Sequence, residues 1–324
     1  MQRRAFCRYV GSIPLWVSVA NAQQAEKVRV IGYLSPGAES SSRERAFQEQ
    51  LRALGWVEGQ NLRIEFRRAA NDSNRLAAMA EELVRLKVDV IAAQSTPAVQ
   101  AARKATGTIP IVMSAADPLG SGFVASLARP GGNITGLSMM MPELAGKRLE
   151  LLRDFLPKFS RVAFLGHGGD PAHKQFTQQT QDAGRKLGIQ VQVLIVQRPE
   201  EFAGAFAEMA KQGAEALVIQ PLFINTLGLG PRLAELAIAN RLPTICDGAG
   251  FAEQGGFVYY GPDTRAFYPR AALYVDKILR GADPATLPVE QPQKFEMVIN
   301  LKTARQLGLG VPRGMLLKAD RVIE

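Results

Sequence analysis

An apolar run leads directly into a helix start in V-D-V-I-A-A-Q-S-T-P-A-V-Q-A-A-R-K-A, residues 88–105. The first part, 88–94, predicts a buried strand of a parallel sheet. The second part, 97–105, predicts a helix with Pro97 in its first turn. Proline is tolerated there because the N–H groups of the first turn have no hydrogen-bond partner within the helix. A strand that leads into a helix is the unit from which parallel α/β sheets are built.

The same unit recurs on both sides of this stretch. We expect further strands at 28–34, 62–67 and 109–116 and helices at 41–54 and 73–87. A loop-rich interval at 126–143 then interrupts the alternation. It restarts with helices expected at 143–155, 171–187, 199–212 and 231–240 and strands at 161–166, 191–196, 216–222 and 243–246. The pattern predicts an α/β fold with two doubly wound parallel-sheet lobes, joined by several crossings that form a hinge.

The N-terminus has the pattern of an export signal. Three arginines within the first eight residues precede the apolar run 10–20, which is too short to span a bilayer. The small residues Ala20-Asn21-Ala22 then predict cleavage before Gln23. Residues 1–22 are therefore expected to be a signal peptide of a periplasmic protein. The sequence Arg3-Arg4-Ala5-Phe6 resembles a twin-arginine signal, and an ordinary secretory signal is the alternative.

Composition argues against several classes of function. The formal charge is +9, and the signal carries three of the arginines, which leaves about +6 (9 − 3) on the mature chain. The basic residues are scattered among acids, so we expect no nucleic-acid surface. Cys246 is the only cysteine left after removal of Cys7, so no internal disulfide can form. The sequence also lacks G-x-S-x-G, H-E-x-x-H, Walker and C-x-x-C motifs, so we expect a binding protein rather than an enzyme, with no cofactor.

Candidate binding residues follow the carboxyl ends of the predicted strands, where ligands of open α/β sheets bind. They are Ser35, Ser95, Thr96 and Asp117 in the first half and His167, Phe223 and Asp247 in the second. The hydroxyls beside helix N–H groups favour a carboxylate, although helix capping alone also explains them. The two aspartates favour an amine or hydroxyl, with a turn or cap as the alternative, and Phe223 is either a stacking or a core residue. An amino acid or small carboxylate fits this set, and a sugar is the alternative.

The residues also resemble a known family. The segments 34–37 (LSPG), 48–67, 95–98 (STPA), 116–136 and 259–263 (YYGPD) are similar to those of ABC-transporter substrate-binding proteins of the type I periplasmic fold. The subfamily includes binding proteins for tryptophan, tyrosine and related small molecules.

This resemblance implies two discontinuous lobes. The first comprises residues 27–138 plus 257–282, and the second 139–256 plus 283–324. It places the same seven candidate residues in the cleft between the lobes. It also implies a monomer that closes on a small-molecule ligand and delivers it to the membrane permease of an ABC importer, without inserting into the membrane after signal cleavage. A periplasmic sensor for a membrane receptor, or an exported enzyme on the same scaffold, is the alternative.

Overall fold

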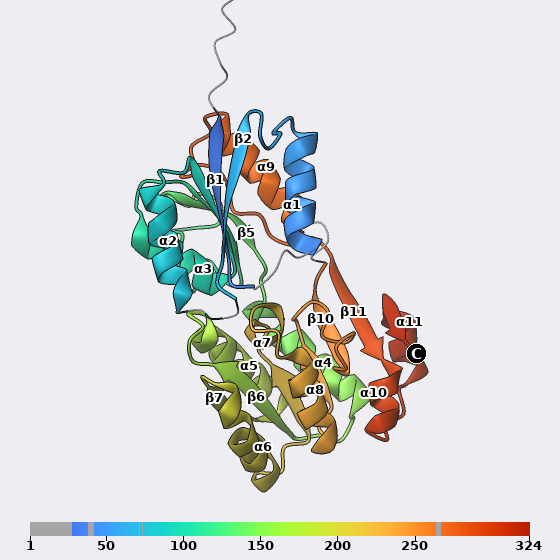
Figure 1. Cartoon of the computed structure of the whole chain (residues 1–324). Coiled ribbons are helices and arrows are strands. Elements are labelled where there is room, and N and C mark those ends of the chain that lie inside the picture. Colours follow the sequence, from blue (N-terminus) through green and yellow to red (C-terminus); the bar gives the residue numbers. More distant parts are fainter. Residues whose placement is uncertain (1–27, 38–41, 71, 73, 264–266) are drawn as a thin grey trace, which may run out of the picture.

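The structure is a computed structural model that describes residues 28–37, 42–70, 72, 74–263 and 267–324. The predicted signal peptide lies outside the described residues. Two α/β lobes lie one above the other, each built around its own sheet (Figure 1). The α/β fold with two parallel-sheet lobes is therefore confirmed. Among the described helices, none combines the length and apolar character that a bilayer crossing requires.

Lobe one contains a five-stranded parallel sheet in the order β2-β1-β3-β4-β5. The strands are β1 (Arg29–Ser35), β2 (Leu62–Arg68), β3 (Val90–Gln94), β4 (Ile111–Ala115) and β5 (Ile134–Ser138). Their apolar runs are buried on both faces, as parallel strands require. Helices α1 (Ser42–Ala53) and α9 (Phe267–Leu279) cover one face. Helices α2 (Arg75–Arg85) and α3 (Thr96–Ala105) cover the other.

Lobe two contains a seven-stranded sheet in the order β12-β11-β10-β9-β8-β6-β7. The strands are β6 (Arg161–His167), β7 (Gln190–Val196), β8 (Ala216–Ile219), β9 (Thr244–Cys246), β10 (Val258–Pro262), β11 (Phe295–Asn300) and β12 (Arg321–Ile323). Only the β10–β11 pair is antiparallel among the described strand pairs of this sheet.

Helices cover both faces of the second sheet as well. Helices α4 (Ala145–Phe155) and α5 (His173–Leu187) pack on one face. Helices α6 (Phe202–Lys211) and α8 (Gly230–Ala239) pack on the other. The short helix α7 (Leu222–Asn225) follows β8, and α10 (Leu301–Gln306) and α11 (Arg313–Lys318) lie near the C-terminus.

The structure corrects the expected course of the chain between the lobes. Strand β10 was expected in lobe one, yet it pairs with β9 and extends the sheet of lobe two. Residues 283–290 were expected in lobe two, yet they run along lobe one, where Val289 N–H donates to Leu127 O at 2.7 Å. Both placements were wrong because they depend on which sheet edge is open, and local sequence does not encode that.

The interval 126–143, expected to be loop-rich, contains the buried strand β5. Gly136 within it has φ +132°, and a Cβ atom there would lie 2.4 Å from the Met113 carbonyl oxygen of β4. Only glycine permits this close approach between the two strands. The glycines that suggested a loop therefore include one that the sheet itself requires.

Candidate ligand-binding site

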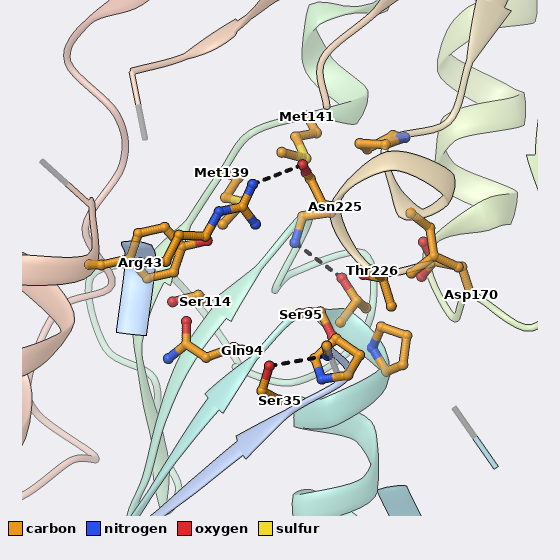
Figure 2. A pocket seen from close by; sticks show the side chains of 18 of the residues that line it. Ser35, Arg43, Gln94, Ser95, Ser114, Met139, Met141, Asp170, Asn225 and Thr226 are labelled. Atoms are coloured by element: carbon orange, nitrogen blue, oxygen red, sulfur yellow. Dashed lines mark hydrogen bonds between the residues drawn. The ribbon is translucent and has the colours of Figure 1, made fainter. Parts of the chain in front are cut away.

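A cavity of about 300 Å³ opens between the lobes at the carboxyl ends of the central strands (Figure 2). Lobe one contributes the carboxyl ends of β1, β3 and β4 with the residues that follow them, the segment after β5, and residues of α1 and α9, and lobe two contributes the segments after β6 and β8. The lining residues are Tyr33, Ser35, Pro36, Gly37, Arg43, Gln94, Ser95, Thr96, Pro97, Ser114, Ala116, Met139, Met141, Asp170, Pro221, Leu222, Asn225, Thr226 and Tyr268. Three of the seven candidate residues, Ser35, Ser95 and Thr96, are among them.

The N-terminus of α3 forms one wall of this cavity. Ser95 is the N-cap residue, and its hydroxyl accepts a hydrogen bond from Ala98 N–H at 3.4 Å. Thr96 Oγ1 accepts from Ala116 N–H at 3.1 Å, which ties the helix start to the end of β4. Ser95 has φ +101°, a strained conformation for a residue with a side chain. Such strain is concentrated at ligand clamps, and here it places the positive end of a helix against the cavity.

Asp170 supplies a negative charge from lobe two. Its side chain is 4% exposed and follows β6 by three residues. Oδ1 accepts from Ala172 N–H at 3.0 Å, and Oδ2 accepts from Gln220 Nε2 at 2.6 Å. Gln220 is itself oriented, because its Oε1 accepts from His167 N–H at 2.7 Å. Burial raises the pKa of Asp170 to about 6. Within the described part of the chain, no lysine or arginine forms a salt bridge with this carboxylate.

A hydrogen bond crosses the mouth of the cavity between the lobes. Arg43 of α1 donates from Nη2 to Asn225 Oδ1 of α7 at 3.2 Å (Figure 2). The Arg43 guanidinium also lies 5.6 Å from the ring centroid of Tyr268 in α9. A second contact crosses nearby, where Gln175 Nε2 donates to Gly120 O. Both contacts join lobe one to lobe two.

Two polar side chains on the lobe-one wall have no hydrogen-bond partner in the part of the chain that the structure describes. Gln94 ends β3 and Ser114 lies beside it in β4, at paired positions of the sheet. They are 6% and 1% exposed, respectively. Neither the Gln94 amide nor the Ser114 hydroxyl finds a hydrogen-bond partner among the described residues. Buried polar groups are nearly always paired in native proteins, so this corner of the cavity calls for an explanation.

Four of the candidate residues do not line the cavity. Asp117 Oδ1 accepts from Gly120 N–H at 2.8 Å and so closes a turn. His167 lies in a separate inter-lobe hollow of about 560 Å³. Its Nδ1 accepts from Gly169 N–H and its Nε2 donates to Gln197 O at 3.1 Å, while burial lowers its pKa and favours the neutral ring.

The other two candidates of this group belong to the core. Phe223 is 1% exposed and packs edge-on against His167 and Phe202. Asp247 is equally buried and accepts from Arg148 Nη1 at 2.7 Å. Arg148 also donates to Met141 O, in the segment that joins β5 of lobe one to α4 of lobe two. Neither Phe223 nor Asp247 lines this cavity, because both side chains point into packed structure.

Several lining residues were not predicted from the sequence. Asp170 had a signal, since it closes the Gly-His-Gly-Gly-Asp turn after β6, but His167 was chosen from that turn instead. Gln94 and Ser114 lie within strands that suggested only core positions. Arg43 and Asn225 have no local signal, because only the approach of the lobes brings them together.

Comparison with known proteins agrees with this architecture. Residues 27–323 match the family model described as ABC transporter substrate binding protein. A tyrosine-binding protein from Clostridioides difficile is 28% identical over 293 residues, covering 88% of this chain and 82% of the relative.

Two solved structures extend the comparison. A Streptococcus pneumoniae ABC domain in complex with L-Trp superposes with a TM-score of 0.83 at 26% identity, over 91% of this chain and 99% of that one. A substrate-binding protein with adhesive properties from Clostridium difficile, in a ligand-free, open form, gives 0.66 at 25% identity over the same shares. The resemblance found in the sequence is confirmed, and this chain belongs to the ABC transporter substrate-binding protein family.

Proposed function

We propose that this chain binds an amino acid between its lobes and delivers it to the membrane permease of an ABC importer. The observation that carries the proposal is the pair of opposite charges in one cavity. Asp170 presents a buried carboxylate from lobe two, and α3 presents its positive end from lobe one. An α-amino acid carries the two complementary charges on adjacent atoms.

The amine subsite follows from the hydrogen bonds of Asp170. Gln220 and Ala172 both donate to its oxygens, which favours the ionised carboxylate even though burial opposes it. A buried carboxylate without a cation is costly, and an incoming ammonium group relieves that cost. The carboxylate of the ligand takes the Ser95–Thr96 end of α3, where hydroxyls and the helix dipole favour an anion.

The body of the ligand lies against apolar side chains. Met139, Met141 and Leu222 contribute aliphatic and thioether surface, and Tyr268 contributes a ring. This lining favours an amino acid with a large apolar or aromatic side chain over a sugar. The L-Trp complex and the tyrosine-binding relative are in keeping with this choice.

Closure of the lobes is the second part of the proposal. The Arg43–Asn225 contact joins the lobes at the cavity, and the Gln175–Gly120 contact joins them outside its lining. The structure is also more similar to the L-Trp complex than to the ligand-free, open relative, with TM-scores of 0.83 and 0.66. We infer that this arrangement is the closed state and that the crossings between the lobes act as its hinge.

The location follows from the N-terminal segment. We propose that residues 1–22 direct export to the periplasm and that the mature protein begins at Gln23. Mass-spectrometric sequencing of the protein from the periplasmic fraction tests this. A cytoplasmic protein that keeps Met1 contradicts it.

The binding proposal is tested by calorimetry with a panel of L-amino acids. Asp170→Asn should weaken the binding of every ligand that the parent binds, because the ammonium loses its counter-charge. Asp117→Asn is the matched control, since Asp117 makes a turn outside the cavity and should be silent. If the parent binds no amino acid, the proposed ligand class is wrong. If a strain lacking the protein takes up the bound amino acid at the normal rate, the transport role is wrong.

A further inference from the structure

We propose that Gln94 and Ser114 form a specificity pocket for a neutral hydroxyl group at the far end of the ligand's side chain. The inference rests on the proposed function, because it takes the α-amino and α-carboxylate ends as held by Asp170 and α3. It assigns a role to two of the buried polar side chains that have no hydrogen-bond partner among the described residues, the two that line this cavity.

The position of the pair follows from the register of the sheet. Gln94 and Ser114 are paired across β3 and β4, so in a parallel sheet their side chains leave the same face. Ala92 and Val112, two residues earlier on the same strands, belong to the apolar cluster beneath α1 and α9. The pair therefore continues this apolar face to the point where the sheet meets the cavity.

The placement separates this corner from the charged end of the site. In Figure 2, Gln94 and Ser114 lie on one side of the cavity together with Arg43, whereas Asp170 lies on the opposite side. Ser95 lies between them. A ligand held by its ammonium at Asp170 and its carboxylate at α3 thus directs its side chain towards Gln94 and Ser114.

The chemistry of the pair selects a hydroxyl. The Gln94 amide offers one acceptor oxygen and two donor hydrogens, and the Ser114 hydroxyl offers one donor and acceptor lone pairs. A ligand hydroxyl donates to one of them and accepts from the other, so it satisfies both side chains at once. An apolar tip leaves both unpaired, and a charged tip loses its hydration without gaining a counter-charge from either residue.

Sites built to bond a ligand hydroxyl reject the analogue that lacks it, because their buried polar groups are then left unsatisfied. The probes are L-tyrosine and L-phenylalanine, which differ by one hydroxyl, and L-glutamate, which carries a charged tip. We expect the parent to bind L-tyrosine at least about tenfold more tightly than L-phenylalanine, and more tightly than L-glutamate.

The variants are Gln94→Met, Ser114→Ala and their combination, which keep side-chain volume close to that of the parent. The double variant should bring the tyrosine-to-phenylalanine affinity ratio to about one. Its ligand-free melting temperature should be unchanged or higher, because the change removes buried groups without partners. Gln192→Met on β7 is the control for the affinity ratio, because Gln192 lies outside the cavity: its Oε1 is buried without a partner among the described residues, and its Nε2 donates to Glu208 O at 3.2 Å. It should leave the ratio unchanged.

Three other results would overturn the hydroxyl pocket. If the parent binds both aromatic amino acids equally, or if the double variant keeps the parent's ratio, the pocket does not bond a hydroxyl and the inference fails while the proposed function stands. If L-glutamate binds more tightly than L-tyrosine, the corner accepts an anion and the inference is equally overturned. If the parent binds none of the three probes, the inference fails. If the parent also binds no other L-amino acid of the panel, the proposed function is wrong as well.

Discussion

Replacing Asp170 with Asn should weaken ligand binding and at the same time stabilise the ligand-free protein near neutral pH. The carboxylate is almost fully buried, and burial raises its pKa from 3.8 to about 6. This rise in the pKa of Asp170 corresponds to about 3 kcal/mol of unfavourable free energy for the ionised group in the folded protein. A binding site that holds a charge for its ligand carries this cost while it is empty.

The pH dependence gives the sign of the stability effect. A carboxyl whose folded-state pKa is raised contributes stability that is present below its unfolded pKa, near 4, and is lost as pH rises through about 6. The amide of Asn does not titrate, so the variant avoids that loss. The Asn variant loses about 1 kcal/mol of folding free energy, because the Asn side chain places an N–H donor opposite the Gln220 Nε2 donor, where the carboxylate accepted a hydrogen bond. We expect a net gain of about 1–2 kcal/mol at about pH 7.5 and none at about pH 4.

Affinity should change in the opposite direction. Loss of a hydrogen bond to a charged ligand group costs about 1.5–3 kcal/mol, which lowers affinity by about tenfold to 150-fold. Calorimetry measures the affinity, and denaturant unfolding at both pH values measures the stability, with Asp117→Asn as the control. Unchanged affinity, or a stability change that is the same at both pH values, would refute the assigned role of Asp170.

Three further outcomes are expected. Affinity of the parent for its amino acid should be constant near about pH 7, where the ligand's ammonium is charged, and fall as pH drops below about 6, because protonation removes the charge of Asp170 that the ammonium needs; a flat profile across this acidic range in calorimetry contradicts this. Arg43→Ala and Asn225→Ala should each weaken binding by about threefold to tenfold, by loss of one inter-lobe hydrogen bond, and small-angle scattering should show incomplete contraction with ligand; full contraction contradicts this. Arg148→Met should lower the free energy of unfolding by about 3–5 kcal/mol, since it leaves Asp247 buried without its partner, and adding Asp247→Leu should recover most of the loss; denaturant unfolding measures both, and an additive loss contradicts the pairing.

Local pattern was sufficient to predict the architecture. Apolar runs such as 88–94 are buried on both faces of a parallel sheet, and this double burial makes the runs continuous and easy to recognise. Ser35, Ser95 and Thr96 were also accessible from sequence, because a residue at the carboxyl end of a strand and the start of a helix has a fixed place in any βα unit. Strand β5 was missed because Gly136, a residue typical of loops, is needed there for a close contact with β4.

What the sequence determined by itself were features that repeat along the chain: the βα alternation, the division into two lobes and the helix start that faces the cavity. Tertiary structure alone decided which lobe receives β10, that Asp170 rather than Asp247 faces the cavity, and that Arg43 meets Asn225. The physical reason is range. Secondary structure follows from neighbours a few residues apart, whereas the site is made by side chains from segments far apart in sequence. The charge and the hydrogen bonds of each of these side chains depend on which neighbours the packing of the lobes places beside it.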